Sequence, residues 1–378
     1  MGSAENKNQE NCIRRSVEVE YWVIDKRGRL VEPGELIDAS EGVEREFVKP
    51  LIEIKTTPCE TTQELSDELL RRLSRVLEKG EELGKRLVPL ATPINSDGIE
   101  EIPGERTRIQ NKVVGESFGY VRHCAGTHVH IEQQPGKEVD QLNSIIAIDP
   151  ALALVNSSPW LNGDRIAVGA RSRAYRWMAY DGVAHQGRLW SYVDSLAEWR
   201  LRLERRYEEF VTAAVDRGID PEVVEENFDS ESTVWIPTRL RDEFGTVEWR
   251  SPDAALPTDV VSLADIVGRV CDSEVRIRGE SGWVNTVDDE VVLPEFDSVL
   301  AYLEDAIRDG LRSHELMMYL KRLGFDIDRY SPVSRELAQE GPVSQAEARS
   351  MRLSYADRLR EDVQRAGPGV GFDAVADD

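Results

Sequence analysis

The sequence predicts an α+β fold in which helices cover one face of an antiparallel sheet and the other face carries polar side chains. Four strand-like segments, over residues 14–24, 47–57, 123–132 and 245–250, alternate polar and apolar residues. Such strands present two chemically different faces. Segments with helical spacing separate them along the chain. At 378 residues, the chain is long enough to bury a large core in one big domain or two smaller ones.

The first strand, over residues 14–24, sets the pattern. Glu18 and Glu20 point to one face because side chains alternate along a strand, whereas Val17 and Val19 point to the other. Two carboxylates two residues apart can converge on a hard cation. A half-buried strand with its polar face in water is the ordinary alternative, and it is favoured when this strand is taken alone.

The other three strands repeat the alternation. Their polar positions are Glu53 and Lys55, then His128, His130 and Glu132, and finally Glu248 and Arg250. In an antiparallel sheet whose apolar face is covered by helices, these side chains would form one anionic floor. Crowded carboxylates repel strongly. We therefore expect Mg²⁺ among them, with imidazole as a further ligand for Mg²⁺ or Mn²⁺.

Helices are predicted between and after the strands. Thr61 or Thr62 caps a helix that runs to about Leu87 and precedes a short buried strand over residues 87–91. Further helices are predicted over residues 142–155, 194–216, 263–276 and 296–320. The last two of these are expected to pack on the far side of the sheet.

The C-terminal part of the chain differs in character from the rest. Ser344 and Glu347 form a capping box for one helix, and Gly-Pro-Gly and Asp-rich residues follow it. We therefore expect a flexible N-terminus over residues 1–13, one main domain over residues 14–330, and a C-terminal helix with a flexible acidic tail over residues 331–378.

The charge balance restricts the partners. Lys and Arg number 47 against 71 Asp and Glu, a formal net charge of −24 at pH 7. Such a field repels phosphate backbones, so we expect no nucleic-acid partner. Because the acidic excess is spread along the whole chain, we interpret it as an adaptation to high cytoplasmic salt. An ordinary acidic protein is the alternative.

Cysteine usage and hydropathy point to a cytoplasmic location. The four cysteines are scattered, with no CxxC pair and no metal-ligand spacing, which favours a reduced compartment. Residues 1–11 lack an apolar run, so we expect no signal peptide. No apolar stretch approaches membrane-spanning length, so we expect no membrane partner.

Two arginines complete the predicted site. Arg171 and Arg250 can grip carboxylate or phosphate oxygens with their planar guanidinium groups. Metals that neutralise charge and an arginine that stabilises a moving phosphoryl group are typical of phosphoryl transfer. Arg171 lies among Arg165, Arg173 and Arg176, so a surface basic cluster is its alternative. The motif GxxxxGK[ST] is absent and no GxGxxG follows a strand, so an ATP site would be of another type.

Six segments resemble the motifs of the type 2 glutamate–cysteine ligase (carboxylate–amine ligase) family. They span residues 17–21, 51–56, 124–130, 156–159, 169–173 and 245–250. The resemblance runs in order from about residue 14 to about residue 275. With its acidic composition, the chain is most similar to the glutamate–cysteine ligases of salt-loving archaea.

This resemblance implies a fold and an activity. The fold would be a glutamine-synthetase-like α+β domain whose antiparallel sheet forms the active-site floor, here over residues 14–330. The reaction would use ATP and Mg²⁺, with Mn²⁺ as an alternative. The γ-carboxylate of glutamate would take the γ-phosphoryl group of ATP, and the α-amine of cysteine would then attack the acyl phosphate to form γ-glutamylcysteine.

The resemblance also implies residue roles. Carried over motif by motif, the metal ligands would be Glu18, Glu20, Glu53, His128 and Glu248. Glu53 and Arg250 would be catalytic, Arg250 as the contact to the transferring phosphoryl group of ATP, and Arg171 would hold glutamate. Many family members have a shorter Cys-Gly-His run before the histidine, which leaves open whether His128 or His130 is the ligand. The tail after about residue 330 has no family counterpart.

Two further functions stay open. One is a ligase that joins glutamate to another amine. The other is a non-catalytic relative that binds nucleotide or metal and keeps the fold for assembly or regulation. The complete set of acidic and arginine residues argues against the second function, because a protein that no longer catalyses the reaction should have lost some of these residues. The sequence leaves a homo-oligomer open as well.

Overall fold

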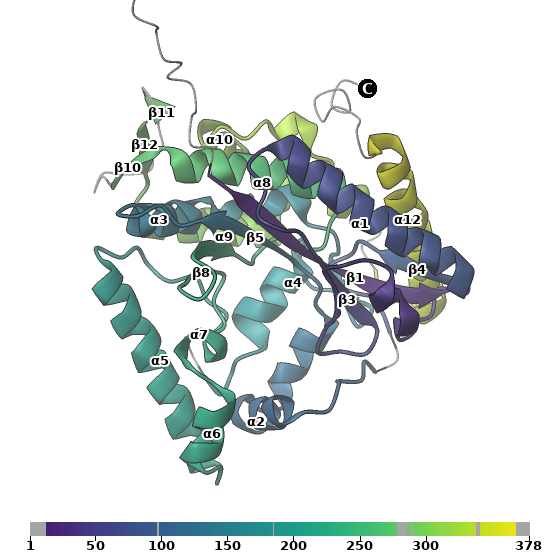
Figure 1. Cartoon of the computed structure of the whole chain (residues 1–378), viewed down its shortest axis with the longest axis horizontal. Coiled ribbons are helices and arrows are strands. Elements are labelled where there is room, and N and C mark those ends of the chain that lie inside the picture. Colours follow the sequence, from purple (N-terminus) through teal and green to yellow (C-terminus); the bar gives the residue numbers. More distant parts are fainter. Residues whose placement is uncertain are drawn as a thin grey trace, which may run out of the picture.

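The structure is a computed structural model of the chain (Figure 1). It describes residues 13–96, 98–183, 185–277, 286–287, 290–337 and 341–367. The predicted flexible N-terminus lies outside the described residues except for Ile13. The predicted acidic tail after residue 367 also lies outside them.

A seven-stranded antiparallel sheet forms the centre of the molecule. Its strands are β1 (Arg15–Asp25), β2 (Val43–Arg45), β3 (Leu51–Lys55), β4 (Lys85–Val88), β5 (Thr127–Glu132), β8 (Thr238–Arg241) and β9 (Thr246–Trp249). Their order is β2-β3-β1-β5-β9-β8, and β4 also pairs with β1. Two small sheets stand apart: the hairpin of β6 (Trp160–Leu161) and β7 (Asp164–Arg165), and β10 (Glu274–Ile277), β11 (Thr286–Val287) and β12 (Glu290–Leu293).

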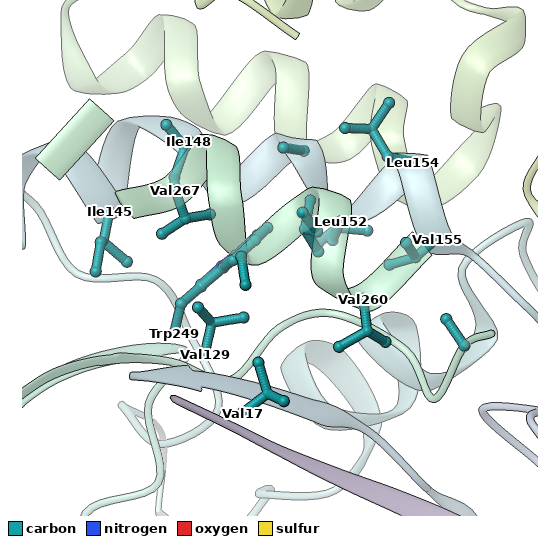
Figure 2. Close-up of a cluster of buried hydrophobic side chains, with 14 of the residues drawn as sticks. Val17, Val129, Ile145, Ile148, Leu152, Leu154, Val155, Trp249, Val260 and Val267 are labelled. Carbon is teal, nitrogen blue, oxygen red and sulfur yellow. The ribbon is translucent and has the colours of Figure 1, made fainter. Parts of the chain in front are cut away.

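Helices cover the apolar face of this sheet, as predicted. They are α1 (Thr62–Leu83), α3 (Glu138–Ile148), α8 (Pro257–Asp272), α9 (Phe296–Arg308) and α10 (His314–Arg322). Figure 2 shows Val17, Val129 and Trp249 rising from three strands toward Val260 and Val267 of α8. All of these side chains are at most 1% exposed. Burial of this apolar surface is the main contribution that fixes the face on which each strand's polar residues lie.

A second group of helices lies on the side of the sheet opposite α8 (Figure 1). It comprises α2 (Glu105–Val114), α4 (Ala170–Arg173), a π-helical turn (Ala174–Met178), α5 (Leu196–Asp216), α6 (Pro221–Asn227) and α7 (Ser230–Thr233). Ile109, Phe118, Phe210 and Phe228 belong to a separate apolar cluster in this group. The group therefore has its own core beside the polar face.

The chain after residue 330 contains α11 (Val333–Glu336) and α12 (Gln345–Ala366). The predicted capping box is confirmed: Ser344 and Glu347 exchange hydrogen bonds at the start of α12. On β1, the polar face ends at Glu20. The next two residues on that face, Trp22 and Ile24, are apolar and are buried in a cluster that includes residues of α12. The division of the chain at residue 330 stays a prediction.

Several predicted boundaries were wrong. The first helix ends at Leu83 instead of Leu87, because Gly84 turns the chain with a positive φ of 68°. The strand predicted over 123–132 begins only at Thr127. The helix predicted over 142–155 is α3 followed by a 3₁₀ helix (Asp149–Val155), and the helix predicted over 296–320 is divided into α9 and α10.

None of the helices in the described part of the chain is both long and apolar enough to cross a membrane. Three cysteines fall within the described residues (Cys59, Cys124 and Cys271), and each is a buried free thiol.

Candidate functional site

The register of the sheet brings the predicted acidic residues together. The cross-strand pairs are Glu20 with Glu53, Glu18 with His128, and His130 with Glu248. Since side chains alternate along each strand, all of these residues share the face opposite the core. The predicted anionic floor therefore exists, with Glu53 and Glu248 at its most buried positions, 4% and 1% exposed.

Three groups of side chains on this floor can each hold a cation. They are Glu18, Glu53 and His128; Glu18, His130 and Glu248; and Glu20, Glu46 and Glu53, and within each group the ligand atoms lie within 4.8 Å of one another. Carboxylate oxygen and imidazole nitrogen suit Mg²⁺ and Mn²⁺. In addition, Nε2 of His130 is buried without a hydrogen-bond partner among the described residues. The side chains thus fit divalent cations, and both histidines lie where a cation would bind.

Glu46 and Arg239 were missed by the sequence analysis. Glu46 lies just before the segment that was assigned to the second strand, and Arg239 belongs to β8, which was not predicted. Neither segment alternates clearly enough to predict a strand, because Val43-Glu44-Arg45-Glu46 and Thr238-Arg239-Leu240-Arg241 each contain a single apolar residue.

Arginines neutralise Glu248. Nε of Arg239 donates to Oε2 of Glu248 at 2.5 Å, and Nη1 of Arg241 donates to the same oxygen at 3.4 Å. Nε of Arg250 lies 3.3 Å from the other oxygen, Oε1. Burial alone would raise the pKa of Glu248, but the attraction of Arg239 and Arg250 outweighs it and holds the pKa well below the usual value. Glu248 is therefore ionised at neutral pH.

Two imidazoles lie beside Glu18. Nδ1 of His128 lies 2.9 Å from Oε2 of Glu18, and Nε2 of His130 lies 3.6 Å from it. Burial opposes ionisation of Glu18, but the hydrogen bond with His128 and the nearby imidazole of His130 hold its pKa below the usual value. Burial and the nearby Arg250 lower the pKa of His128 to about 4, so this imidazole is neutral at pH 7. A neutral imidazole has a lone pair for a metal.

The third group is the least neutralised part of the floor. Burial, together with the repulsion of Glu46 and Glu18, raises the pKa of Glu53 to about 9. Burial and the charge of Glu20 raise the pKa of Glu46 to about 8. Burial raises the pKa of Glu20 to about 7, despite the backbone N–H of Gly126, which donates to it at 2.6 Å. A divalent cation bound among these carboxyls would favour their ionised form.

Arg171 is not part of a surface cluster, because it is only 5% exposed. Its Nη1 donates to the carbonyl of Ser251 at 2.9 Å, and its Nη2 donates to the carbonyl of Arg250 at 3.1 Å. A side chain in place of Gly126 would come within 2.0 Å of this guanidinium, which explains the glycine at that position. Arg171 thus holds the backbone that carries Arg250.

A buried network lies behind Arg250, under the floor. Asp149 is fully buried and accepts hydrogen bonds from Nη2 of Arg176 at 2.8 Å, from Nε1 of Trp249 at 2.9 Å, and from the hydroxyl of Ser251. Arg176 also donates to the Ser251 hydroxyl at 2.8 Å. The residues on either side of Arg250 are therefore fixed to the helix layer.

Two cavities adjoin the floor. One, of about 40 Å³, is lined by Arg171, Arg250 and Trp235 among others. The other, of about 370 Å³, opens at the ends of β1 and β9 and is lined by His130 and Phe244 among others. The floor thus has a confined arginine-lined cavity and a larger one beside its second cation group.

Two solved structures share the fold of this chain. The chain matches the crystal structure of a bifunctional glutathione synthetase from Pasteurella multocida with a TM-score of 0.53 and 13% identity, over 92% of this chain and 53% of that one. It matches a glutamate–cysteine ligase from Francisella tularensis in complex with AMP with a TM-score of 0.52 and 12% identity, over 97% and 91% of the two chains. These matches confirm the predicted fold class.

The sequence identifies the family. Residues 16–349 match the profile of glutamate-cysteine ligase family 2 (GCS2), and the chain belongs to that family. The match extends well past residue 275, where the resemblance was expected to end, and the expectation that the chain after about residue 330 has no family counterpart was wrong as far as residue 349. A protein of Rhodococcus jostii with the provisional name glutamate–cysteine ligase 2-1 is 27% identical over 313 residues, which are 78% of this chain and 75% of that protein.

The network under the floor gives a first prediction. Asp149→Asn removes the charge that balances buried Arg176, so we expect the free energy of unfolding to fall by about 3 kcal/mol. Urea unfolding followed by fluorescence measures this change. The matched control is Asp242→Asn, which breaks the exposed ion pair with Arg200 and should change stability little. Equal stability of the two variants would show that the network contributes nothing.

The raised pKa values of the third group give a second prediction. A carboxyl whose folded pKa lies above its unfolded value of 4.5 makes the folded protein lose stability as pH rises toward that folded pKa, about 8 for Glu46. Without metal, stability should therefore fall between about pH 6 and pH 8, and Glu46→Gln should reduce this slope. Melting temperatures across that range, with the exposed Glu41→Gln as control, measure it. An unchanged slope in Glu46→Gln would contradict the assigned cause.

Proposed function

We propose that this protein is an ATP- and Mg²⁺-dependent ligase that joins L-glutamate to L-cysteine through a γ-glutamyl phosphate. Membership of glutamate-cysteine ligase family 2 and a fold shared with a glutamate–cysteine ligase bound to AMP support the class of reaction and the use of ATP. The single observation that carries the proposal is the acidic floor with its three cation-sized groups. Such a floor suits the transfer of a phosphoryl group.

The floor residues would hold the metal. We assign this role to Glu18, Glu20, Glu53, His128 and Glu248, and we add Glu46 and His130. Bound there, Mg²⁺ would supply neutralisation of the charge on the phosphate oxygens. The ligand side chains would determine the position of the Mg²⁺ ion, because the sheet register and the buried network restrict their movement.

The arginines would orient the reacting groups. Arg250 keeps its charge beside Glu248 and would stabilise the phosphoryl group while it moves from ATP to the γ-carboxylate of glutamate. Arg171 lines the confined cavity, and its guanidinium nitrogen Nε has no hydrogen-bond partner among the described residues. That nitrogen would hold glutamate, and the other two hold the backbone at Arg250.

Both chemical steps balance without a side-chain nucleophile. In the first, an oxygen of the glutamate γ-carboxylate bonds to the γ-phosphorus and ADP leaves. In the second, the amine of cysteine attacks the acyl carbon, phosphate leaves, and the nitrogen loses a proton. Cys124 is no nucleophile for either step, since burial raises the pKa of its thiol to about 12.

A substrate panel tests this function. We expect ADP release that requires ATP, Mg²⁺, glutamate and cysteine together, with γ-glutamylcysteine identified by mass spectrometry. Parallel assays at low and high KCl test the proposed adaptation to salt. Turnover with another amine but not with cysteine would show that cysteine is not the acceptor substrate. Nucleotide binding without turnover of any amine would overturn the ligase assignment.

Glu53→Gln tests the floor directly. Glu53 takes part in two of the three cation groups, so we expect kcat to fall by about 100-fold or more while the protein stays folded. Glu132→Gln is the matched control, because Glu132 shares the polar face of β5 but pairs with Arg14 outside the three groups. Near-normal turnover of Glu53→Gln would refute its assigned role.

A further inference from the structure

A lysine ammonium group already lies among the carboxylates that would bind metal. Nζ of Lys55 lies 2.9 Å from Oε2 of Glu53 and 3.9 Å from Oε1 of Glu18. Lys55 follows Glu53 by two residues on β3 and pairs directly with Glu18 on β1. Its position is therefore fixed by the register of the sheet.

The same ammonium has a partner outside the cation groups. Nζ of Lys55 lies 3.0 Å from Oε2 of Glu44, whose side chain is 60% exposed, whereas that of Glu53 is 5% exposed. Glu44 belongs to the edge strand β2 and is not part of any of the three groups. Lys55 can thus leave Glu53 and keep an ion pair at the rim of the floor.

A divalent cation and this ammonium compete for Glu53. Two positive charges a few ångströms apart repel, and the repulsion grows where water is excluded. Glu53 belongs to the first and third groups and Glu18 to the first and second. Among the described residues, Lys55 pairs with Glu18, Glu44 and Glu53 but not with Glu248, and the second group adds only Glu248 and His130 to Glu18.

We propose that Lys55 is a built-in counter-ion that holds the floor together without metal and is displaced toward Glu44 when a divalent cation binds. This inference rests on the proposed metal-binding function of the floor. It assigns Lys55 a positioning role that weakens cation binding at the groups containing Glu53. The group formed by Glu18, His130 and Glu248 is affected least.

Titration of the full-length protein with Mn²⁺, in the absence of nucleotide, tests the inference. Isothermal calorimetry should show that Lys55→Met binds Mn²⁺ about fivefold more tightly than the wild type. In EDTA, the melting temperature of Lys55→Met should be lower than that of the wild type, and saturating Mn²⁺ should remove most of the difference. Unchanged or weaker Mn²⁺ binding by a folded Lys55→Met would overturn the proposal.

Lys49→Met is the matched control, because it also removes one positive charge from the anionic protein. Lys49 pairs with Glu32 and Glu100, away from the floor, so Mn²⁺ affinity should not change. Glu44→Gln removes the outer partner of Lys55 and should weaken Mn²⁺ binding. If Lys55→Met does not fold, Lys55→Gln gives the same comparison. A wild-type protein that binds no Mn²⁺ would overturn the metal floor itself, an outcome distinct from unchanged affinity in the variant.

Discussion

Repulsion between carboxylates that the sheet register forces together is the constraint on which the site depends. Glu18, Glu20, Glu46, Glu53 and Glu248 all belong to the three cation-sized groups. Two charges 4 Å apart repel by about 1 kcal/mol in water and by about 4 kcal/mol near a protein surface. The protein balances this repulsion locally, with arginines at Glu248 and an ammonium at Glu53, and the imidazole of His128 hydrogen-bonds to Glu18. The apolar core on the other face makes the main contribution to holding the strands in this register.

The sequence predicted the layered architecture and four of the strands, but it missed two short strands and misplaced several helix ends. Alternation identified β1, β3, β5 and β9, because their apolar residues pack against a single helix layer. It gave no indication of β2, which has only three residues, or of β8, whose polar residues are arginines. Helix ends such as Leu83 depend on one glycine conformation, and the 3₁₀ segment after α3 depends on tertiary packing. Neither can be derived from periodicity.

Alternation also predicted the positions of most of the acidic residues in the candidate site, but not all of them. Every predicted acidic ligand lies on the floor, because face and register follow directly from alternation. Glu46 could not be assigned in this way, since it lies outside regular structure and reaches Glu20 and Glu53 only through the fold. The contacts of Arg171 with the carbonyls of Arg250 and Ser251 join residues about 80 positions apart. A contact between residues so far apart in the chain produces no periodic pattern in the sequence.

The docking of α12 has a consequence for synthesis. Arg352 donates to the carbonyls of Gly28, Pro93 and Asn95, and Ala356 packs in the same cluster as Trp22. Ribosomes add about 5–20 residues per second. The strand that carries Trp22 therefore emerges on the order of tens of seconds before the helix that shields it. During that interval, the nascent polypeptide exposes an indole that the finished protein hides, which makes it a target for chaperones that act during translation.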